Sequence, residues 1–475
     1  MLSGTGTSIV CTYVRFRGQH NALGFSSATR TGWLQLIDVS KYTWSAVGGL
    51  LVGCLAAVAC SPVYCQISAS GNLTLKDIIS QTLMSNPASL ASGEQLRQAE
   101  SAVRAAQAQQ HFQLSFNSAA GVSNADVIQP PPSRETFGAI QNTLTIPLLI
   151  GPKAADNVNE ATGSLSAAQA SYRSSELALA GKAASAYFDL LKKRDLASVT
   201  QENLDTANQE LKDAQQRNNA GDIPELDVLQ AQVPVSSDQA TFLQAQADAE
   251  VAQETLNDLL GRPLDAPLAV VDETGAQQSP NYSIEDARTR ALAASADVSA
   301  AVAQVSSDEA ALDAAKRFAD PAVSLQAIDL RSRDVTSFSR EDTLQASVTL
   351  PIDDGGLGKA TVDSAAEALE QARREVEMAR RATLTSVSSA YITVQSSLAE
   401  VAATAEAQEI AQKTYDKTRL GYENGLYPLV DAITAENALA QARSAAVESL
   451  YDAASARYIL DSTVNGYPLD LAWNK

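Results

Sequence analysis

The sequence has very little cysteine, histidine or aromatic residue for a chain of 475 residues. All 4 Cys lie within the first 65 positions, and His111 is the single histidine beyond them. Disulfide frameworks, thiol catalysis, cysteine zinc sites and histidine-based triads are therefore excluded from the body of the chain. The sequence predicts no catalytic, cofactor-binding or metal-binding residues. A carboxylate-dependent hydrolase stays as a minor alternative that would need a compact pocket.

Basic residues are also scarce, since 35 Lys and Arg stand against 55 Asp and Glu and give a net charge of −20. Neutralising a phosphate backbone needs patches of Lys and Arg, so we expect no nucleic-acid partner. Aromatic residues make up only 5% of the chain, whereas alanine, glutamine and glutamate are abundant. This composition favours long helices that pack closely through small side chains.

No apolar run reaches the roughly 20 residues of a transmembrane helix. The longest is the uncharged stretch 46–59, which has the length of a signal-peptide core and ends in a small-x-small pattern. We therefore predict that residues 1–65 are an N-terminal extension and signal peptide; a short buried helix is the alternative. Cys60 and Cys54 stand in lipobox-like contexts. Either Cys60 (or Cys54) is lipidated, or both cysteines are removed with the signal peptide.

An internal duplication organises the rest of the chain. Special residues recur at a constant separation of 204 positions: Pro147 and Pro351, Gly151 and Gly355, Tyr187 and Tyr391, Gly221 and Gly425, Pro224 and Pro428, Asp227 and Asp431. We predict a first repeat at 72–265, a linker at 266–280, a second repeat at 281–466 and a C-terminal tail at 467–475.

Each repeat has the same order of expected elements. A short helix and a medium helix come first, then two strands, then a very long helix and a fourth helix after a Gly/Pro turn. The long helices, about 153–219 and 357–422, have coiled-coil-like spacing of Leu, Val and Ala, and each would reach about 100 Å. The other helices are expected at about 74–85, 88–111 and 225–260, and at 283–295, 297–318 and 429–464.

The expected strands, about 113–124, 136–149, 321–331 and 340–352, alternate between apolar and hydroxyl or amide residues. A soluble hairpin with one face on a core would give this pattern, and so would a membrane β-barrel wall with a polar lumen. Four strands cannot close a barrel, and open strand edges are not tolerated in lipid. If the strands span a membrane, several chains must therefore share one barrel.

Several motifs recur in the order and spacing of a known family. They are Ser85-Asn86-Pro87, the segment 351–356 (PIDDGG), the two helix tips 217–229 and 421–433, and the closing Leu259-Leu260-Gly261. With the duplication, they make the chain resemble the TolC family of outer-membrane efflux proteins over nearly all of 72–466. The resemblance implies a mainly α fold with a membrane β-barrel portion. Four strands per chain would enter a 12-stranded barrel of a homotrimer, above a long coiled-coil α-barrel.

The function implied by this resemblance is a passive exit duct in the outer membrane, with most of the chain in the periplasm. No nucleotide-binding loop is visible in the sequence, so energy must come from partners. The family's partners are a periplasmic adaptor (membrane fusion) protein and an inner-membrane RND or ABC-type pump of a tripartite efflux or type I secretion system. The alternative is a periplasmic coiled-coil scaffold or adaptor without a pore.

The resemblance also implies roles for residues at the two helix tips. Adaptor docking would involve Ala220, Gly221, Asp222, Asn424, Gly425 and Leu426. A periplasmic gate would use Asp227, Tyr422 and Asp431, with three copies of Asp431 forming an anionic ring. Helix capping or first-turn stabilisation is a compatible reading of Asp227 and Asp431. Tyr427 stands where some members of the family carry a basic tip residue, and Thr434 stands where a second ring aspartate can occur.

Overall fold

The computed structural model describes residues 72–125, 133–149, 152–274, 279–333, 338–350 and 354–466. The expected N-terminal extension and signal peptide, including Cys54 and Cys60, lie outside the described residues. So do the C-terminal tail at 467–475 and positions 275–278 of the expected linker. The described residues pack as parts of one unit.

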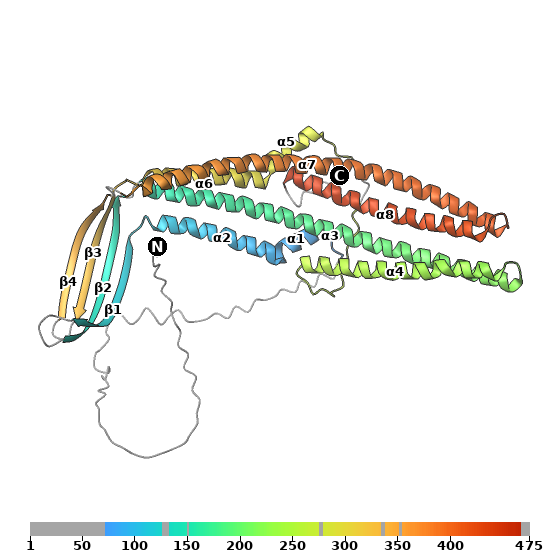
Figure 1. The fold of residues 1–475 in the computed structure, drawn as a ribbon, viewed down its shortest axis with the longest axis horizontal. Helices are drawn as coiled ribbons and strands as arrows, with labels where there is room; N and C mark the ends of the chain where they lie inside the picture. The colour runs from blue at the N-terminus through green and yellow to red at the C-terminus, as the bar shows by residue number, and fades with distance from the viewer. Residues whose placement is uncertain are drawn as a thin grey trace, which may run out of the picture. The chain divides into compact units, whose positions relative to one another are not determined.

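The duplication appears as two runs of helix, helix, strand, strand, helix, helix (Figure 1). The first consists of α1 (Leu75–Ser85), α2 (Pro87–Ala108), β1 (Gln113–Ala125), β2 (Ser133–Leu149), α3 (Pro152–Ala220) and α4 (Glu225–Leu259). The second consists of α5 (Ile284–Ala294), α6 (Ala296–Lys316), β3 (Ala322–Arg333), β4 (Phe338–Thr349), α7 (Leu357–Glu423) and α8 (Leu429–Asn465). The helices begin and end within three residues of the expected positions.

The strands differ slightly from expectation at their ends. β2 begins at Ser133 rather than at 136, and β4 ends at Thr349 rather than at 352. Proline at position 351 has no amide hydrogen for the strand ladder, which explains why β4 stops before it. The two helices of about 69 and 67 residues, α3 and α7, have the expected lengths.

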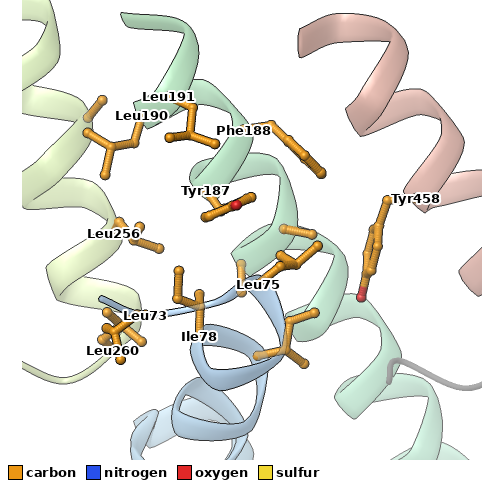
Figure 2. Packing of buried hydrophobic residues seen from close by; sticks show 14 of the residues in the cluster. Leu73, Leu75, Ile78, Tyr187, Phe188, Leu190, Leu191, Leu256, Leu260 and Tyr458 are labelled. Atoms are coloured by element: carbon orange, nitrogen blue, oxygen red, sulfur yellow. The ribbon is translucent and has the colours of Figure 1, made fainter. Parts of the chain in front are cut away.

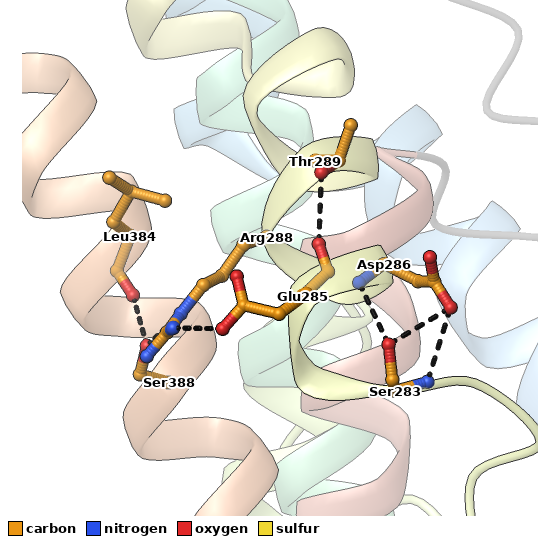
Figure 3. Close-up of polar contacts among 7 residues, drawn as sticks. All are labelled: Ser283, Glu285, Asp286, Arg288, Thr289, Leu384 and Ser388. Atoms are coloured by element: carbon orange, nitrogen blue, oxygen red, sulfur yellow. Dashed lines mark hydrogen bonds and ion pairs between the residues drawn. The ribbon is translucent and has the colours of Figure 1, made fainter.

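The short helices α1 and α5 begin with the same local device. In α1, Thr74 accepts a hydrogen bond from the Asp77 amide at 3.2 Å, and Asp77 binds back to Thr74. Ser283 and Asp286 repeat this capping box at α5, as Figure 3 shows. Reciprocal caps of this kind satisfy amide groups that the first helical turn leaves free.

Arg288 joins α5 to the long helix α7. Its guanidinium donates to Ser388 Oγ of α7 at 3.0 Å and to Glu285 of its own helix at 2.7 Å (Figure 3). Ser388 in turn donates to the carbonyl of Leu384 at 2.7 Å. The short helix is thereby held against the middle of α7.

The Ser85-Asn86-Pro87 motif fastens the start of the first repeat to its end. Asn86 caps α2 by accepting from the Ala88 amide at 2.9 Å, and its own amide donates to the Leu259 carbonyl at 3.1 Å. Ser85 Oγ donates to the Leu260 carbonyl at 2.8 Å. The motif therefore has a structural function at the end of α4.

The four strands form one antiparallel sheet in the order β1-β2-β3-β4. Its register places Leu114 opposite Leu144, and Ala327 opposite Leu344. Because side chains alternate across a strand, these residues share one face, and Gln141, Thr143 and their partners share the other. Figure 1 shows that all four strands meet the helices at the same end of the sheet.

The main core surrounds the middle of α3, where α1 and α4 pack against it (Figure 2). Tyr187, Leu190 and Leu256 are fully buried there. The Tyr187 hydroxyl donates to the Val271 carbonyl at 2.5 Å, which ties the segment after α4 to the core. A smaller cluster around Val387, Val394 and Leu460 repeats this arrangement among α5, α7 and α8.

Close helix contact depends on small residues, as the composition predicts. Gly163 of α3 lies so near α6 that a Cβ atom there would approach the Ser307 Cα to 2.7 Å. Ser164 and Ser307 are hydrogen-bonded at 3.0 Å, and Ser307 also donates to the Glu160 carbonyl at 3.0 Å. Across the described helices, none is both long and apolar enough to span a membrane.

Candidate functional site at the helix tips

The turn between α3 and α4 forms the first tip. Gly221 has a φ of 82°, the left-handed conformation that ends a helix at low cost only for glycine. The amides of Gly221 and Asp222 bond back to the carbonyls of Asn218 and Arg217, each at 2.9 Å. Asn218 Nδ2 closes the turn by donating to the Ile223 carbonyl at 2.8 Å. Ala220, Gly221 and Asp222 are exposed at this tip.

The turn between α7 and α8 has the same backbone pattern. Gly425 has a φ of 70°, and the Leu426 amide bonds to the Gly421 carbonyl at 2.8 Å. Asn424 Nδ2 donates to the Leu420 carbonyl at 2.7 Å. Asn424, Gly425 and Leu426 are exposed, so all six residues expected to dock an adaptor lie on the surface of the two tips.

Tyr427 has a packing function at the second tip. Its ring covers Gly421, where a Cβ atom would overlap the ring. Thr434, which stands where a second ring aspartate can occur, donates to the carbonyl of Val430 in its own helix at 2.7 Å. Neither residue therefore contributes a charge to the tip.

A small apolar cluster joins the two tips. It contains the buried residues Ala214, Ala231 and Leu429, with the partly buried Tyr422 against them. These residues come from all four helices of the tips, α3, α4, α7 and α8. Arg217 lies over the Tyr422 ring at 4.9 Å from its centroid, a cation–π contact between the two hairpins. Each chain thus holds its own two hairpins together at the tip.

Tyr422 lies in the cluster with its hydroxyl buried. Within the described part of the chain, that hydroxyl has no hydrogen-bond partner. Burial raises the pKa of Tyr422, while nearby Arg217 lowers it and Asp227 raises it further. The structure therefore brings Tyr422 and Asp227 near each other without a hydrogen bond between them in one chain.

Asp227 and Asp431 occupy equivalent places in the two repeats. Each is the third residue of its helix, and Pro224 and Pro428 are the capping residues. Neither aspartate is itself a helix cap, so of the two local functions the sequence allowed, first-turn stabilisation is the one observed. Asp431 is exposed and Asp227 is partly buried.

Glu436 is a site residue that sequence reasoning missed. It is only 7% exposed in α8, and neither of its carboxyl oxygens has a hydrogen-bond partner among the described residues. Burial, with a contribution from the neighbouring carboxyl of Glu210, raises the pKa of Glu436 to about 8. A glutamate flanked by alanine and asparagine gives no signal of burial in the sequence.

A cavity of about 430 Å³ lies near the tips, and Glu210 is one of the residues that line it. Charged groups of both signs line it, among them Glu210, Asp213, Arg217 and Arg419. No group of three or more His, Cys, Asp and Glu side chains is placed to hold a metal ion within the described ranges. The lining therefore combines carboxylates, guanidinium groups and apolar side chains.

Comparison with known proteins identifies the family. The family model for outer membrane efflux proteins matches residues 78–262 and 287–466, one match for each repeat. The chain belongs to the outer membrane efflux protein family. The resemblance inferred from the tip, strand and duplication motifs is thereby confirmed.

Two relatives are similar over much of their length. The outer membrane efflux protein BepC of Brucella suis biovar 1 (strain 1330) is 27% identical over 338 residues, which cover 70% of this chain and 73% of BepC. Outer membrane protein TolC of Escherichia coli (strain K12) is 26% identical over 304 residues, which cover 59% of this chain and 60% of TolC.

Solved structures share the fold at low sequence identity. CusC superposes with a TM-score of 0.73 at 18% identity, over 83% of this chain and 92% of CusC. VceC of Vibrio cholerae superposes with a TM-score of 0.68 at 20% identity, over 82% of this chain and 96% of VceC. The TolC-like fold expected from the sequence is confirmed.

Family membership places the protein in the outer membrane and gives it a transport function. Its relatives are outer-membrane channel proteins rather than enzymes, as the sequence predicts. The minor alternative of a carboxylate-dependent hydrolase is thereby wrong. The two tips and the sheet are the parts of the chain that bear most directly on its function.

Proposed function

We propose that the protein is a homotrimeric exit duct whose helical tips lie in the periplasm and are opened by an adaptor and an inner-membrane pump. The observation that carries the proposal is the open sheet. In the described structure, β1 and β4 each pair with a neighbour on one side only. Unpaired strand edges are not stable in lipid, so the sheet needs other copies to close it.

An exposed apolar stripe on α4 supports contacts between copies along the helical part. Leu226, Leu229, Val233, Leu243 and Val251 are each more than half exposed. At 100° per residue they fall within an arc of about 100°, which is one face of the helix. An apolar stripe of this kind on an otherwise strongly acidic chain suits burial against a neighbouring copy.

The tips carry the apolar surface that a docking partner would cover. Leu426 is 75% exposed, and Tyr427 and Val430 are more than half exposed beside it. Together with the backbone turns at Gly221 and Gly425, they give two projecting hairpin ends per chain. We propose that an adaptor binds Ala220, Gly221, Asp222, Asn424, Gly425 and Leu426 there, and that a pump of RND or ABC type supplies the energy.

The gate would lie at the same tips. Asp431 is exposed at the start of α8, so three copies around an axis would bring three carboxylates together. Rings of carboxylates favour cations in pores. Tyr422 and Asp227 lie at the contact between the two hairpins. A movement of one hairpin relative to the other would therefore change the surroundings of both side chains.

The decisive experiment is to purify the full chain from outer membranes in detergent. Light scattering should give the mass of three chains, and insertion into a planar bilayer should give discrete conductance steps. A monomer that never conducts would contradict the duct and support the alternative, a coiled-coil scaffold without a pore. Co-purification with an adaptor that depends on Gly221 and Gly425 would test the docking part separately.

A further inference from the structure

Charged residues gather on one half of one face of the sheet. The register places Asn142, Asp329 and Asp342 in one cross-strand row. In the next row Arg331 lies opposite Arg340, and in the row after that Arg333 lies opposite Phe338. All of these rows are in the half of the sheet away from the helices, toward the end of β3 at Arg333 and the start of β4 at Phe338.

This charged half shares its face with the apolar residues of the sheet. Leu114, Phe116, Leu344 and Val348 stand at positions of the same alternation, and each is more than half exposed. The opposite face carries mostly Gln, Ser and Thr residues, with Ile328, Leu330 and Glu341 among them. In a membrane barrel the apolar face meets lipid, so the arginines also point toward lipid.

The length of this face of β4, from Val348 at its apolar end to Phe338 beyond its charged rows, gives the depth of these arginines. From Val348 to Phe338, ten residues along β4 rise about 34 Å, which at a tilt of about 40° corresponds to about 26 Å of membrane depth. That equals the height of the lipid-facing band of about 25 Å found in such barrels, with the charged rows in its outer part. Phe338, at 68% exposure, then marks the outer interface. Arg331 and Arg340 lie about 5 Å inside it, within reach of the headgroups for a long side chain.

Arg331 and Arg340 are each paired with an aspartate, so Arg333 supplies the excess positive charge of the array. Arg331 Nε lies 3.3 Å from Asp329 Oδ1, and Arg340 Nη2 lies 3.0 Å from Asp342 Oδ2. Asp329 Oδ1 also lies 4.0 Å from Arg340 Nε, so one carboxylate contacts both of the opposed guanidinium groups. Each guanidinium side chain is still about half exposed, at 49% and 58%.

We propose that Arg331, Arg340 and Arg333 form a binding site for the phosphate groups of outer-leaflet glycolipid. Guanidinium groups bind phosphate with two parallel hydrogen bonds, and the headgroup phosphates are the anions available at this depth. The aspartates beneath hold the two guanidinium groups in place. The inference rests on the proposed barrel, and it gives the barrel a fixed depth in the membrane.

The test measures binding of lipid A, a diphosphorylated glycolipid, to the purified full chain by native mass spectrometry. The double variant Arg331→Gln/Arg340→Gln should bind about tenfold less lipid A, a loss of 1.4 kcal/mol. The same lipid without phosphates should bind the wild-type protein about as weakly. The matched control Arg373→Gln/Arg380→Gln removes two arginines of α7 that are equally exposed and likewise paired with glutamates, and should bind as wild type.

A second variant guards against misfolding caused by unpaired aspartates. Replacing Asp329 and Asp342 by Asn together with the two arginines keeps the net charge of the array at its wild-type value, and this variant should lose lipid binding while keeping the wild-type mass and conductance. Wild-type lipid binding by either assembled variant, or equal binding of the phosphate-free lipid, would overturn the proposal. Failure of the wild-type chain to assemble and conduct would instead contradict the duct itself, so the two failures are distinguishable.

Discussion

The carboxyl group of Glu436 in α8 lies buried beside that of Glu210 in α3. Glu210 accepts a hydrogen bond of 2.7 Å from the Tyr415 hydroxyl, whereas Glu436 has no such donor within the described residues. Asp238 adds a further negative charge, and Arg419 opposes it. Ionising both groups would place two negative charges side by side in a buried site, which is unfavourable. The proton therefore stays on Glu436.

We expect Glu436→Gln to stabilise the protein at high pH. The pKa of Glu436 rises from 4.5 to about 8 on folding, so the folded chain holds a proton that the unfolded chain releases. The free energy of unfolding therefore falls as the pH rises from about 4.5 to 8. Glutamine keeps the shape without the charge, and should add on the order of 1–3 kcal/mol at pH 9 and little at pH 4.

Thermal unfolding of the detergent-solubilised protein at pH 4, 7 and 9 checks this expectation. Glu406→Gln is the matched control, since Glu406 is exposed in α7 and should leave the pH dependence unchanged. If wild type and Glu436→Gln lose stability equally between pH 4 and 9, Glu436 does not hold the proton.

The sequence predicted the repeated elements well because the duplication tests each element twice. The pairs separated by 204 residues, such as Gly221 with Gly425, fall in equivalent turns in the structure. Glu436 could not be found in this way, because the equivalent position in the first repeat is Gln232, and Glu210 corresponds to Thr414. Which polar residue of a helix is buried depends on which neighbour covers it, and the helix period does not contain that information.

The tips show the same limit. Sequence placed Asp227 and Asp431 at the helix starts, but could not distinguish a cap from a first-turn position until Pro224 and Pro428 were seen as the capping residues. The contact of Arg217 with Tyr422 is a tertiary one, and the repeat has Gly421 and Asn218 at the equivalent positions. Comparing the two repeats in the sequence therefore gives no indication of this contact.

Two glycines of α3 should respond in opposite ways to alanine. At Gly163 a Cβ atom would press on the backbone of Ser307, so Gly163→Ala should cost about 1–3 kcal/mol through displacement of α6. At Gly181 nothing lies within 4 Å, so Gly181→Ala should stabilise the helix by up to about 1 kcal/mol. Melting temperatures of the two variants check the pair, and a loss at both positions would contradict the close α3–α6 contact.

The equivalent tyrosines of the two repeats should differ in importance. Tyr187 is fully buried, donates to the Val271 carbonyl and accepts from the Glu273 amide at 3.3 Å. Tyr391 is partly exposed and donates to the Tyr282 carbonyl at 3.2 Å. Tyr187→Phe should therefore cost about 1–3 kcal/mol and Tyr391→Phe about 0.5–1 kcal/mol. Denaturant unfolding measures both, and a larger loss at Tyr391 would reverse the assignment.

The proposed ring of Asp431 makes an electrical prediction. Asp431 is exposed, so its carboxylate is available to ions at the tip of a trimer. Asp431→Ala should raise the conductance or weaken the cation preference of bilayer-inserted channels, because three negative charges leave the constriction. Asp431→Asn should change the preference similarly while retaining a polar side chain in the first turn of α8.

Asp363→Ala, which removes an exposed carboxylate from α7 near the sheet, should leave the current–voltage curve unchanged. If both Asp431 variants also give the wild-type curve, the carboxylate does not face the conduction path, and its function is limited to the first turn of the helix.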